Sequence, residues 1–266
     1  MTGPKPEPGP EAGEAARPKL PPLYRLVALD VVTSTNDEAL RLAEEGAEDG
    51  TLVWAREQTK ARGRQGRSWS SPRGNLCLSL VLRPECGPGE AAQLGFIAGL
   101  AMGEAFGSVA PPMIEVTYKW PNDVLLNGRK GAGILLESRS RADGTLDCLI
   151  LGVGANVQHF PDDSEFPATS LRFEGAPPDV SEVELLEAFS RYFQSWVNRW
   201  LDDGFPPIRR AWLNHAHGLG EEIEVRLPRE TLTGTFKDLD ESGALVLELA
   251  DGETRLISAG DVYFGA

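Results

Sequence analysis

The segment 57–82, EQTKARGRQGRSWSSPRGNLCLSLVL, gathers cations that could bind an anion. No acidic residue interrupts it between Glu57 and Glu85, and three glycines are threaded through its basic residues, Lys60, Arg62, Arg64, Arg67 and Arg73. Guanidinium groups recognise carboxylate and phosphate oxygens through paired hydrogen bonds, and glycine lets the backbone approach a ligand closely. In a chain with a formal net charge of -14, this cluster indicates a site for a specific anion.

Two further segments place polar groups beside turns or helix ends. Residues 119–137, KWPNDVLLNGRKGAGILLE, carry cations around an Asn-Gly turn, and STN at 34–36 stands where a helix is expected to begin. None of the three segments has the GxxxxGK[ST] order of a P-loop or the GxGxxG of a dinucleotide-binding fold. Any nucleotide site here must therefore be of another type.

Composition narrows the class of protein. The chain has 26 basic against 40 acidic residues and a pI of about 4.7, which argues against nucleic-acid binding and against docking on anionic membranes. Three cysteines without a Cys-x-x-Cys pair predict neither a disulfide framework nor a zinc site. We expect no signal peptide and no segment long enough to span a membrane. These observations predict a cytoplasmic protein.

The elements that must position these residues alternate between strands and helices. Residues 1–22 are rich in Pro and Gly and are expected to be a disordered tail, too short for a helix-turn-helix. A helix should begin at Ser34 or Thr35 and stop at Gly46, and Asn127-Gly128 predicts a hairpin turn. Strands are expected at 23–32, 51–57, 75–82, 114–120, 124–137 and 146–157, and further helices at 89–109, 180–204 and 206–216. Four short strands within 221–259 predict a small all-β barrel.

The motifs in combination resemble a known family. STN, then Q-x-x-x-R-G-R-x-G-R-x-W, KWPND, GRKGAGIL and GVGANV follow one another as in biotin–protein ligases, most closely the short bacterial class that lacks a DNA-binding domain. The resemblance implies an α+β fold, with a mixed β-sheet flanked by helices like that of class II synthetases. It places a catalytic domain at 23–217 and a C-terminal SH3-like β-barrel at 218–266.

The resemblance also implies a reaction and its residues. Biotin and ATP, with Mg²⁺, would give biotinyl-5′-AMP and pyrophosphate, and the biotinyl group would pass to a lysine of a biotin carboxyl carrier protein. The ligase would hold no permanently bound cofactor, would bind no DNA, and relatives suggest a homodimer. The resemblance assigns catalytic roles to Lys130, Asp123 and Arg64, with Asp123 accepting the lysine proton or, instead or in addition, holding Mg²⁺. Biotin would contact Ser34, Thr35, Asn36, Gln58, Arg62, Gly63, Arg64, Lys130 and Gly133. ATP or the adenylate would contact Arg64, Arg67, Trp69, Lys119, Asn122, Lys130 and Asn156.

Alternatives stay open at this level. A lipoate or octanoate ligase shares the implied fold, although its Arg-Arg-x-Ser-Gly-Gly-Gly type of segment is absent. A non-catalytic anion-binding or RNA-binding module would need a basic balance and interleaved aromatics. Trp69 and Asn122 could serve packing and a turn alone. Two residues depart from the family pattern: Ala61 replaces a glycine, at a cost of about 1 kcal/mol if positive φ is required there, and Gln65 replaces a basic residue.

Overall fold

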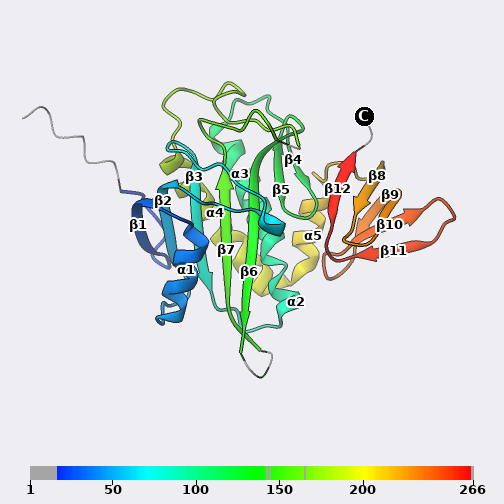
Figure 1. The fold of residues 1–266 in the computed structure, drawn as a ribbon, viewed down its shortest axis with the longest axis horizontal. Helices are drawn as coiled ribbons and strands as arrows, with labels where there is room; N and C mark the ends of the chain where they lie inside the picture. The colour runs from blue at the N-terminus through cyan, green and yellow to red at the C-terminus, as the bar shows by residue number, and fades with distance from the viewer. Residues whose placement is uncertain (1–16, 142, 144, 165, 265–266) are drawn as a thin grey trace, which may run out of the picture.

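The computed structural model describes residues 17–264 except 142, 144 and 165 (Figure 1). Most of the predicted N-terminal tail, residues 1–16, lies outside the described residues. The part that is described packs on the protein: the backbone N–H of Lys19 donates to the Glu187 carboxylate at 2.7 Å, and Leu20 contacts the core. The packed chain therefore extends N-terminally of residue 23.

A seven-stranded sheet forms the centre of the main domain, in the order β1-β2-β3-β7-β6-β5-β4. β1 and β2 run parallel and the other neighbours antiparallel, so the sheet is mixed, as predicted. Its strands are β1 (Arg25–Val32), β2 (Thr51–Gln58), β3 (Leu76–Leu82), β4 (Val116–Lys119), β5 (Asp123–Leu126), β6 (Arg129–Ser140) and β7 (Leu146–Ala155).

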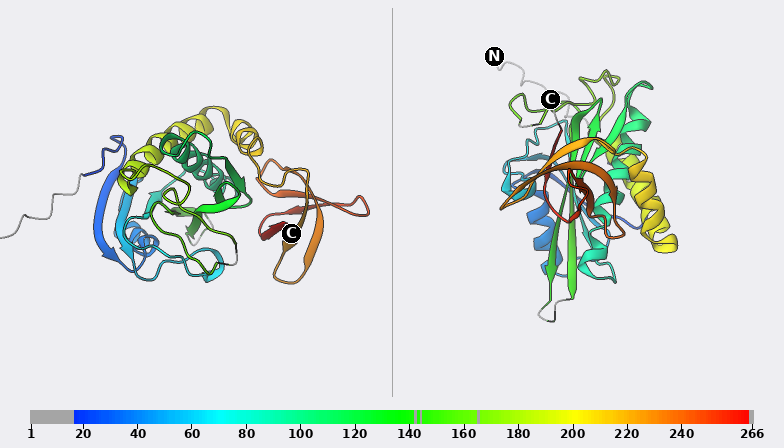
Figure 2. Two further views of the ribbon diagram at one scale, coloured as in Figure 1. Left: turned by 90° about the horizontal axis from the view of Figure 1, so that it is seen from above. Right: turned by 90° about the vertical axis from the view of Figure 1, so that its right-hand side faces the viewer.

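Helices cover both faces of this sheet because the buried strands are apolar on both sides. α1 (Thr35–Glu44) packs on one face, against a small cluster that includes Val53, Val81 and Ile150. α3 (Leu94–Val109), α4 (Glu182–Asp203) and α5 (Phe205–Leu213) pack on the other, where Leu52, Leu78 and their neighbours join the larger core. Figure 2, left, shows α1 and the pair α3 and α4 on opposite sides of the sheet.

The apolar segment 89–109, predicted as one helix, forms two: α2 (Pro88–Ala91) and α3. By length and composition alone, the 22-residue stretch Pro88–Val109 could cross a membrane, so the expectation that no segment approaches that length is wrong. However, most of its apolar part is buried inside the protein. It is apolar on all sides because α3 lies between the sheet and the two helices α4 and α5.

The predicted hairpin is confirmed between β5 and β6. Asn127 and Gly128 have φ of 49° and 74°, the left-handed pair that a two-residue hairpin turn requires. This turn sets a register in which Lys130 pairs with Leu125 and Asp123 with Gly133, so Lys130 and Asp123 lie on neighbouring strands.

The C-terminal domain is a five-stranded antiparallel sheet in the order β11-β10-β9-β8-β12. Its strands are β8 (Glu222–Arg226), β9 (Thr231–Leu239), β10 (Leu245–Leu249), β11 (Thr254–Ile257) and β12 (Asp261–Phe264), of which β12 was not predicted. Within the described residues β11 and β12 do not pair, so the small all-β domain is confirmed while closure into a barrel stays a prediction.

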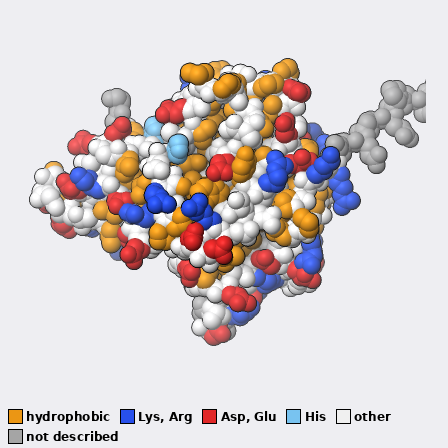
Figure 3. Space-filling model, turned by 180° about the vertical axis from the view of Figure 1, so that it is seen from behind, with side chains coloured by type: hydrophobic (Ala, Val, Ile, Leu, Met, Phe, Trp, Pro, Cys, Tyr) orange, Lys and Arg blue, Asp and Glu red, His pale blue; other side chains and the backbone are white. Residues whose placement is uncertain are grey.

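Acidic and basic side chains mix on the face turned away in Figure 1. Figure 3 shows Lys and Arg interspersed with Asp and Glu on that face. The basic residues that gather without intervening acids in the sequence are those of the loop between β2 and β3.

Candidate active site

A cavity of about 380 Å³ opens at one end of the main sheet, between the loop that joins β2 to β3 and the C-terminal domain. We call residues 59–74 of that loop the arginine loop. All of the predicted site residues line this one cavity, although they come from five separate segments: Ser34, Thr35, Asn36, Gln58, Arg62, Gly63, Arg64, Arg67, Trp69, Lys119, Asn122, Asp123, Lys130, Gly133 and Asn156. Two basic residues of the opening motif, Lys60 and Arg73, do not line it.

The arginine loop closes on itself through its backbone. Gly63 N–H donates to the Arg67 carbonyl at 2.7 Å, and Trp69 N–H donates to the Ala61 carbonyl at 3.0 Å. Among the described non-glycine residues, positive φ occurs only at Gln65, with φ of 55°, and at Asn127. The strain considered for Ala61 is therefore absent, and Gln65 is the loop residue that adopts the left-handed conformation.

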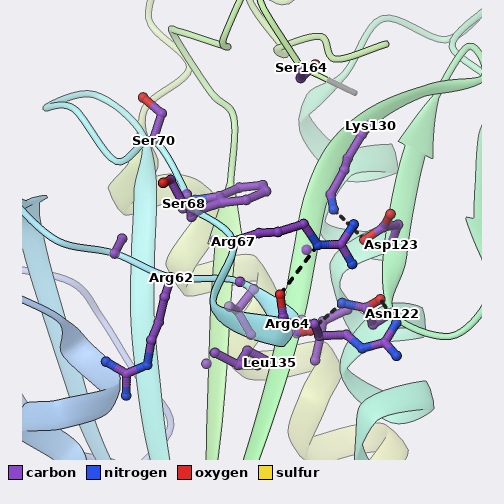
Figure 4. Close-up of a pocket in the computed structure, with 18 of the residues that line it drawn as sticks. Arg62, Arg64, Arg67, Ser68, Ser70, Asn122, Asp123, Lys130, Leu135 and Ser164 are labelled. Atoms are coloured by element: carbon purple, nitrogen blue, oxygen red, sulfur yellow. Dashed lines mark hydrogen bonds and ion pairs between the residues drawn. The ribbon is translucent and has the colours of Figure 1, made fainter. Parts of the chain in front are cut away.

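Two arginines of this loop, Arg64 and Arg67, extend toward Asn122 and Asp123 (Figure 4) and contact the C-terminal domain. Arg64 donates to the Gly260 carbonyl and to the Asn122 side-chain oxygen, each at 3.2 Å. Arg67 donates to the Asp261 carboxylate at 2.7 Å. Burial lowers the pKa of Arg64, although Asp261 and Asp123 oppose that effect. Both guanidiniums thus stand where they could neutralise an anion.

Arg62 lies differently from the sequence expectation. Its stem lines the cavity, but Figure 4 shows its guanidinium pointing away from Arg64 and Lys130. The group forms a two-pronged pair with Asp37, at 2.8 and 2.5 Å, and also reaches Glu137 at 3.3 Å. The hydrogen bonds that Arg62 donates to Asp37 are the main reason that the pKa of Arg62 is raised.

Two lysines bring positive charge to the opposite wall. Lys130 Nζ lies 2.6 Å from Asp123 Oδ1, forming an ion pair. Lys119 Nζ lies 3.2 Å from the centre of the Phe166 ring. Burial, reinforced by Lys130 and Arg67, lowers the pKa of Lys119 to about 8, while Asp123 and Asp261 act in the other direction.

The STN segment forms the polar floor at the α1 end of the cavity. Ser34 caps α1, accepting from Asp37 N–H at 3.4 Å, so the cap falls on Ser34 of the two predicted residues. Thr35 N–H and hydroxyl both donate to Gln58 Oε1, at 2.7 and 3.0 Å. Ser79 donates to the Asn36 side-chain oxygen at 2.5 Å. A ligand with its own donors and acceptors would meet matching groups here.

Trp69 forms part of the cavity wall against β6 and β7. Its indole lies where a Cβ on Gly154 would approach to 2.4 Å, so only glycine leaves room for it. Lys130 Nζ lies 5.4 Å from the Trp69 ring centre. Asn156 is turned to the backbone, donating to the Thr169 carbonyl at 2.9 Å. The half-buried Trp69 ring beside a cation suits a flat, charged ligand.

Comparison with known proteins decides the family. The model described as "Biotin/lipoate A/B protein ligase family" matches residues 67–214, more than half of the chain, and "Biotin protein ligase C terminal domain" matches residues 218–265. The chain belongs to the biotin/lipoate A/B protein ligase family.

Individual relatives place it more closely within that family. A biotin--[acetyl-CoA-carboxylase] ligase from Paracoccus denitrificans is 42% identical over 87% of this chain and 97% of its own length. A bifunctional ligase/repressor BirA from Bacillus subtilis is 34% identical over 90% of this chain and 74% of its own length. The biotin protein ligase from Aquifex aeolicus, solved with biotin and ATP, superposes with a TM-score of 0.76 at 30% identity, covering 90% of this chain and 97% of that one. The resemblance read from the motifs is confirmed.

The ligase fold also brings in residues that the sequence motifs did not reveal. Asp261 and Gly260 come from the C-terminal domain, and Phe166 comes from the loop after β7. Ser79 lies within a buried strand, and Glu137 ends the GRKGAGILLE segment. For Asp261 the sequence did contain a signal: the Asp-Val-Tyr-Phe run after Gly260 has the β-branched and aromatic residues that are typical of a strand.

Proposed function

We propose that this chain is an ATP-dependent biotin–protein ligase. It would activate biotin to biotinyl-5′-AMP, releasing pyrophosphate, and then transfer the biotinyl group to a lysine of a biotin carboxyl carrier protein. One observation carries the proposal: a single cavity holds a hydrogen-bonding floor at 34–36 and, away from it, the cations Arg64, Arg67, Lys119 and Lys130. That cavity lies in a chain 42% identical to a biotin--[acetyl-CoA-carboxylase] ligase.

The first step suits the distribution of charge. A carboxylate oxygen of biotin would attack the α-phosphorus of ATP, forming a phosphorus–oxygen bond while the bond to the β-phosphate breaks. Negative charge grows on the phosphoryl oxygens and on pyrophosphate, where fixed donors contribute typically ~3–4 kcal/mol each in a dry site. Lys130 and Arg64 stand on opposite walls and could meet that charge from two sides.

The second step needs a base. The attacking lysine of the carrier must lose a proton, because its pKa is about 10.4 in water. We propose that Asp123 accepts it while the amine nitrogen bonds to the biotinyl carbonyl carbon and AMP leaves. Asp123 is 9% exposed and paired with Lys130, so its carboxylate is held in the cavity wall.

Magnesium would accompany ATP. Among the described residues no group of three or more His, Cys, Asp or Glu could hold a metal ion. This fits an ion that binds chiefly to substrate phosphates and waters with one or two protein carboxylates, as Mg²⁺ commonly does. Asp123 is the carboxylate we propose for it, where it would help neutralise phosphate charge.

Pyrophosphate exchange into ATP tests the reaction. The protein is incubated with labelled pyrophosphate, Mg²⁺ and ATP, and biotin, lipoate or octanoate is added separately. Exchange with biotin alone is expected. Exchange with lipoate or octanoate instead would move the substrate to the other branch of the family, and no exchange with any acyl acid would contradict the ligase assignment. Transfer is then measured on a purified carrier domain by mass.

Two further expectations belong with this function. We propose that the protein acts in the cytoplasm, where its carboxylase acceptor and ATP are found, and that two copies pair as a homodimer. β1 forms an edge of the sheet and exposes Val31, which is 48% accessible. Sedimentation equilibrium of the purified chain, with and without biotin, measures the assembly state directly.

A further inference from the structure

Glu137, on β6, binds two residues that face the cavity but does not line it. Its Oε2 accepts from the side-chain nitrogen of Asn36 at 2.6 Å. The same carboxylate accepts from Arg62 at 3.3 and 3.4 Å. One side chain therefore holds both the polar floor and the beginning of the arginine loop.

The carboxylate determines which way the Asn36 carboxamide points. An ionised carboxylate can only accept hydrogen bonds, so it must face the amide nitrogen. The amide oxygen then faces Ser79, whose hydroxyl donates to it at 2.5 Å. Gly152 leaves the necessary space, because a Cβ there would lie 2.2 Å from that oxygen. Asn36 is 5% exposed, so a reversed carboxamide would bury mismatched groups.

This orientation propagates to the groups beside it. Ser79 Oγ also lies 2.8 Å from Thr35 Oγ1, and both the Thr35 hydroxyl and its backbone N–H point to Gln58 Oε1. The amide nitrogen of Gln58 in turn donates to Ser71 at 2.9 Å. Each hydroxyl has a single proton, so once the Ser79 proton goes to Asn36, Ser79 can only accept from Thr35, and the Thr35 hydroxyl donates to Ser79 or to Gln58 but not to both.

Arg62 connects the same carboxylate to the arginine loop. Its guanidinium lies between Glu137 and Asp37, the latter in the first turn of α1. The loop therefore leaves β2 with the guanidinium of its first arginine directed away from the other cations of the cavity. The next arginine, Arg64, is then the one directed across it.

We propose that Glu137 is a positioning residue for biotin binding, which fixes the donors and acceptors of the 34–36 floor and the start of the arginine loop without touching the substrate. The inference rests on the proposed ligase function. Its consequence is selective: the ureido head group, with its N–H donors and carbonyl acceptor, should depend on Glu137. The ATP phosphates should depend on Glu137 far less, because Lys119 and Lys130 lie on the opposite wall, and because Arg64 and Arg67 are held by Asn122 and the C-terminal domain.

A second contact offers a matched control. Glu44 of α1 pairs with Arg139 of β6, so it joins the same two elements as the Asn36–Glu137 contact but away from the cavity. Glu137 is 38% exposed in its side chain, and exposed ion pairs contribute little to stability. If Glu137 served only to join α1 to β6, then Glu44→Gln should have the same effect as Glu137→Gln.

The experiment compares the full-length wild type with Glu137→Gln, Glu137→Ala and Glu44→Gln. Biotin and ATP affinities are measured separately by isothermal titration calorimetry, and thermal unfolding is recorded. The Glu137→Gln side chain keeps one acceptor oxygen for the two donors, Asn36 and Arg62. We therefore expect the biotin dissociation constant of this variant to rise about tenfold, the scale of one charge-assisted hydrogen bond. The Glu137→Ala side chain keeps no acceptor, so this variant should bind biotin still more weakly. ATP affinity should stay within about twofold of wild type in every variant.

The outcomes separate this inference from the proposed function. Wild type that binds no biotin would contradict the ligase assignment and this inference with it. If the wild type binds biotin and both Glu137→Gln and Glu137→Ala bind it with wild-type affinity, the inference alone is overturned. A parallel loss of biotin affinity, ATP affinity and thermal stability, or a biotin defect of the same size in Glu44→Gln, would overturn it as well.

Discussion

Lys119 carries its ammonium group into a part of the cavity that is nearly closed to water. The residue is 5% exposed, and its Nζ lies against the Phe166 ring. The contact with an aromatic ring stabilises a buried ammonium group less than hydration and a neighbouring carboxylate would. This explains why burial dominates and lowers the pKa of Lys119 to about 8. Incoming phosphate would supply the missing anion.

ATP affinity should therefore fall at alkaline pH. In the free protein Lys119 loses its proton above about pH 8, whereas bound phosphate favours the protonated form. The dissociation constant of ATP should rise between pH 8 and pH 9.5, by at most about tenfold per pH unit. Lys119→Met should bind ATP more weakly at pH 7 and lose most of this alkaline dependence. An equally steep profile in Lys119→Met would assign the titration to another group.

Arg64 should matter more for keeping the adenylate than for making it. Formation also uses Lys130 and Lys119, which remain, whereas Arg64 is the guanidinium bound to both Asn122 and the Gly260 carbonyl. In Arg64→Ala, pre-formed biotinyl-5′-AMP should dissociate at least about tenfold faster, the scale of one hydrogen bond to a charged group. The escaped adenylate should label exposed lysines of bystander proteins.

A matched variant in the same loop checks this result. Arg73 pairs with Asp30 and Glu57 and does not line the cavity. Arg73→Ala should retain the adenylate as wild type does. Dissociation rates are followed by stopped-flow chase of the pre-formed adenylate, and an unchanged rate in Arg64→Ala would refute the retention role.

At the scale of elements, β7 makes room for the site by carrying glycine at two alternate positions. Gly152 accommodates Asn36, and Gly154 accommodates the Trp69 indole. Both side chains stand on the same face of the sheet because residues two apart in a strand point the same way. The GVG of GVGANV thus clears space for two other segments.

Gly154→Ala should displace the arginine loop. The added Cβ would lie 2.4 Å from Trp69 Nε1, so the indole must move. Overpacking of this kind costs about 1–3 kcal/mol, and we expect that loss in urea unfolding together with weaker ATP binding. Gly133→Ala is the control, since Gly133 pairs with Gly154 across the strands but its Cβ would find neighbours at 3.4 Å. Equal stability of the two variants would contradict this role of Gly154.

The sequence predicted the helices and strands, and which residues line the cavity, far better than it predicted which side chains contact one another. Strand patterns and the Asn127-Gly128 turn are local signals, and they were confirmed. The orientation of Arg62 was not predictable, because its main partner Asp37 is 25 residues away on α1 and its second partner Glu137 is 75 residues away on a strand whose register no local pattern specifies. β12 was missed because a four-residue strand carries little periodicity.

At the scale of the whole molecule, the C-terminal domain completes the cavity wall. Trp120 Nε1 donates to the Gly243 carbonyl at 3.1 Å, and Phe96 packs where only glycine fits at 243. These contacts hold the small sheet beside the β4 edge of the main one, as Figure 1 shows on the right. β12 then presents Asp261 to the arginine loop.

That contact should govern how often the ligand-free loop opens. The Arg67–Asp261 pair joins residues 194 apart, and Asp261 is 16% exposed in its side chain, so the pair is partly shielded from solvent screening. Asp261→Asn keeps the shape of the side chain but removes its charge. Trypsin cleavage within residues 59–74 should then become roughly two- to fivefold faster, as expected when an ion pair that stabilises the closed loop by up to about 1 kcal/mol is lost.

A second variant serves as the control. Glu230→Gln, which removes a carboxylate paired with Arg255 in the same domain, should leave cleavage at the wild-type rate. Cleavage followed by mass spectrometry distinguishes the two: if both variants are cut equally fast, the whole C-terminal domain has loosened, and the Arg67–Asp261 contact is not what restrains the loop.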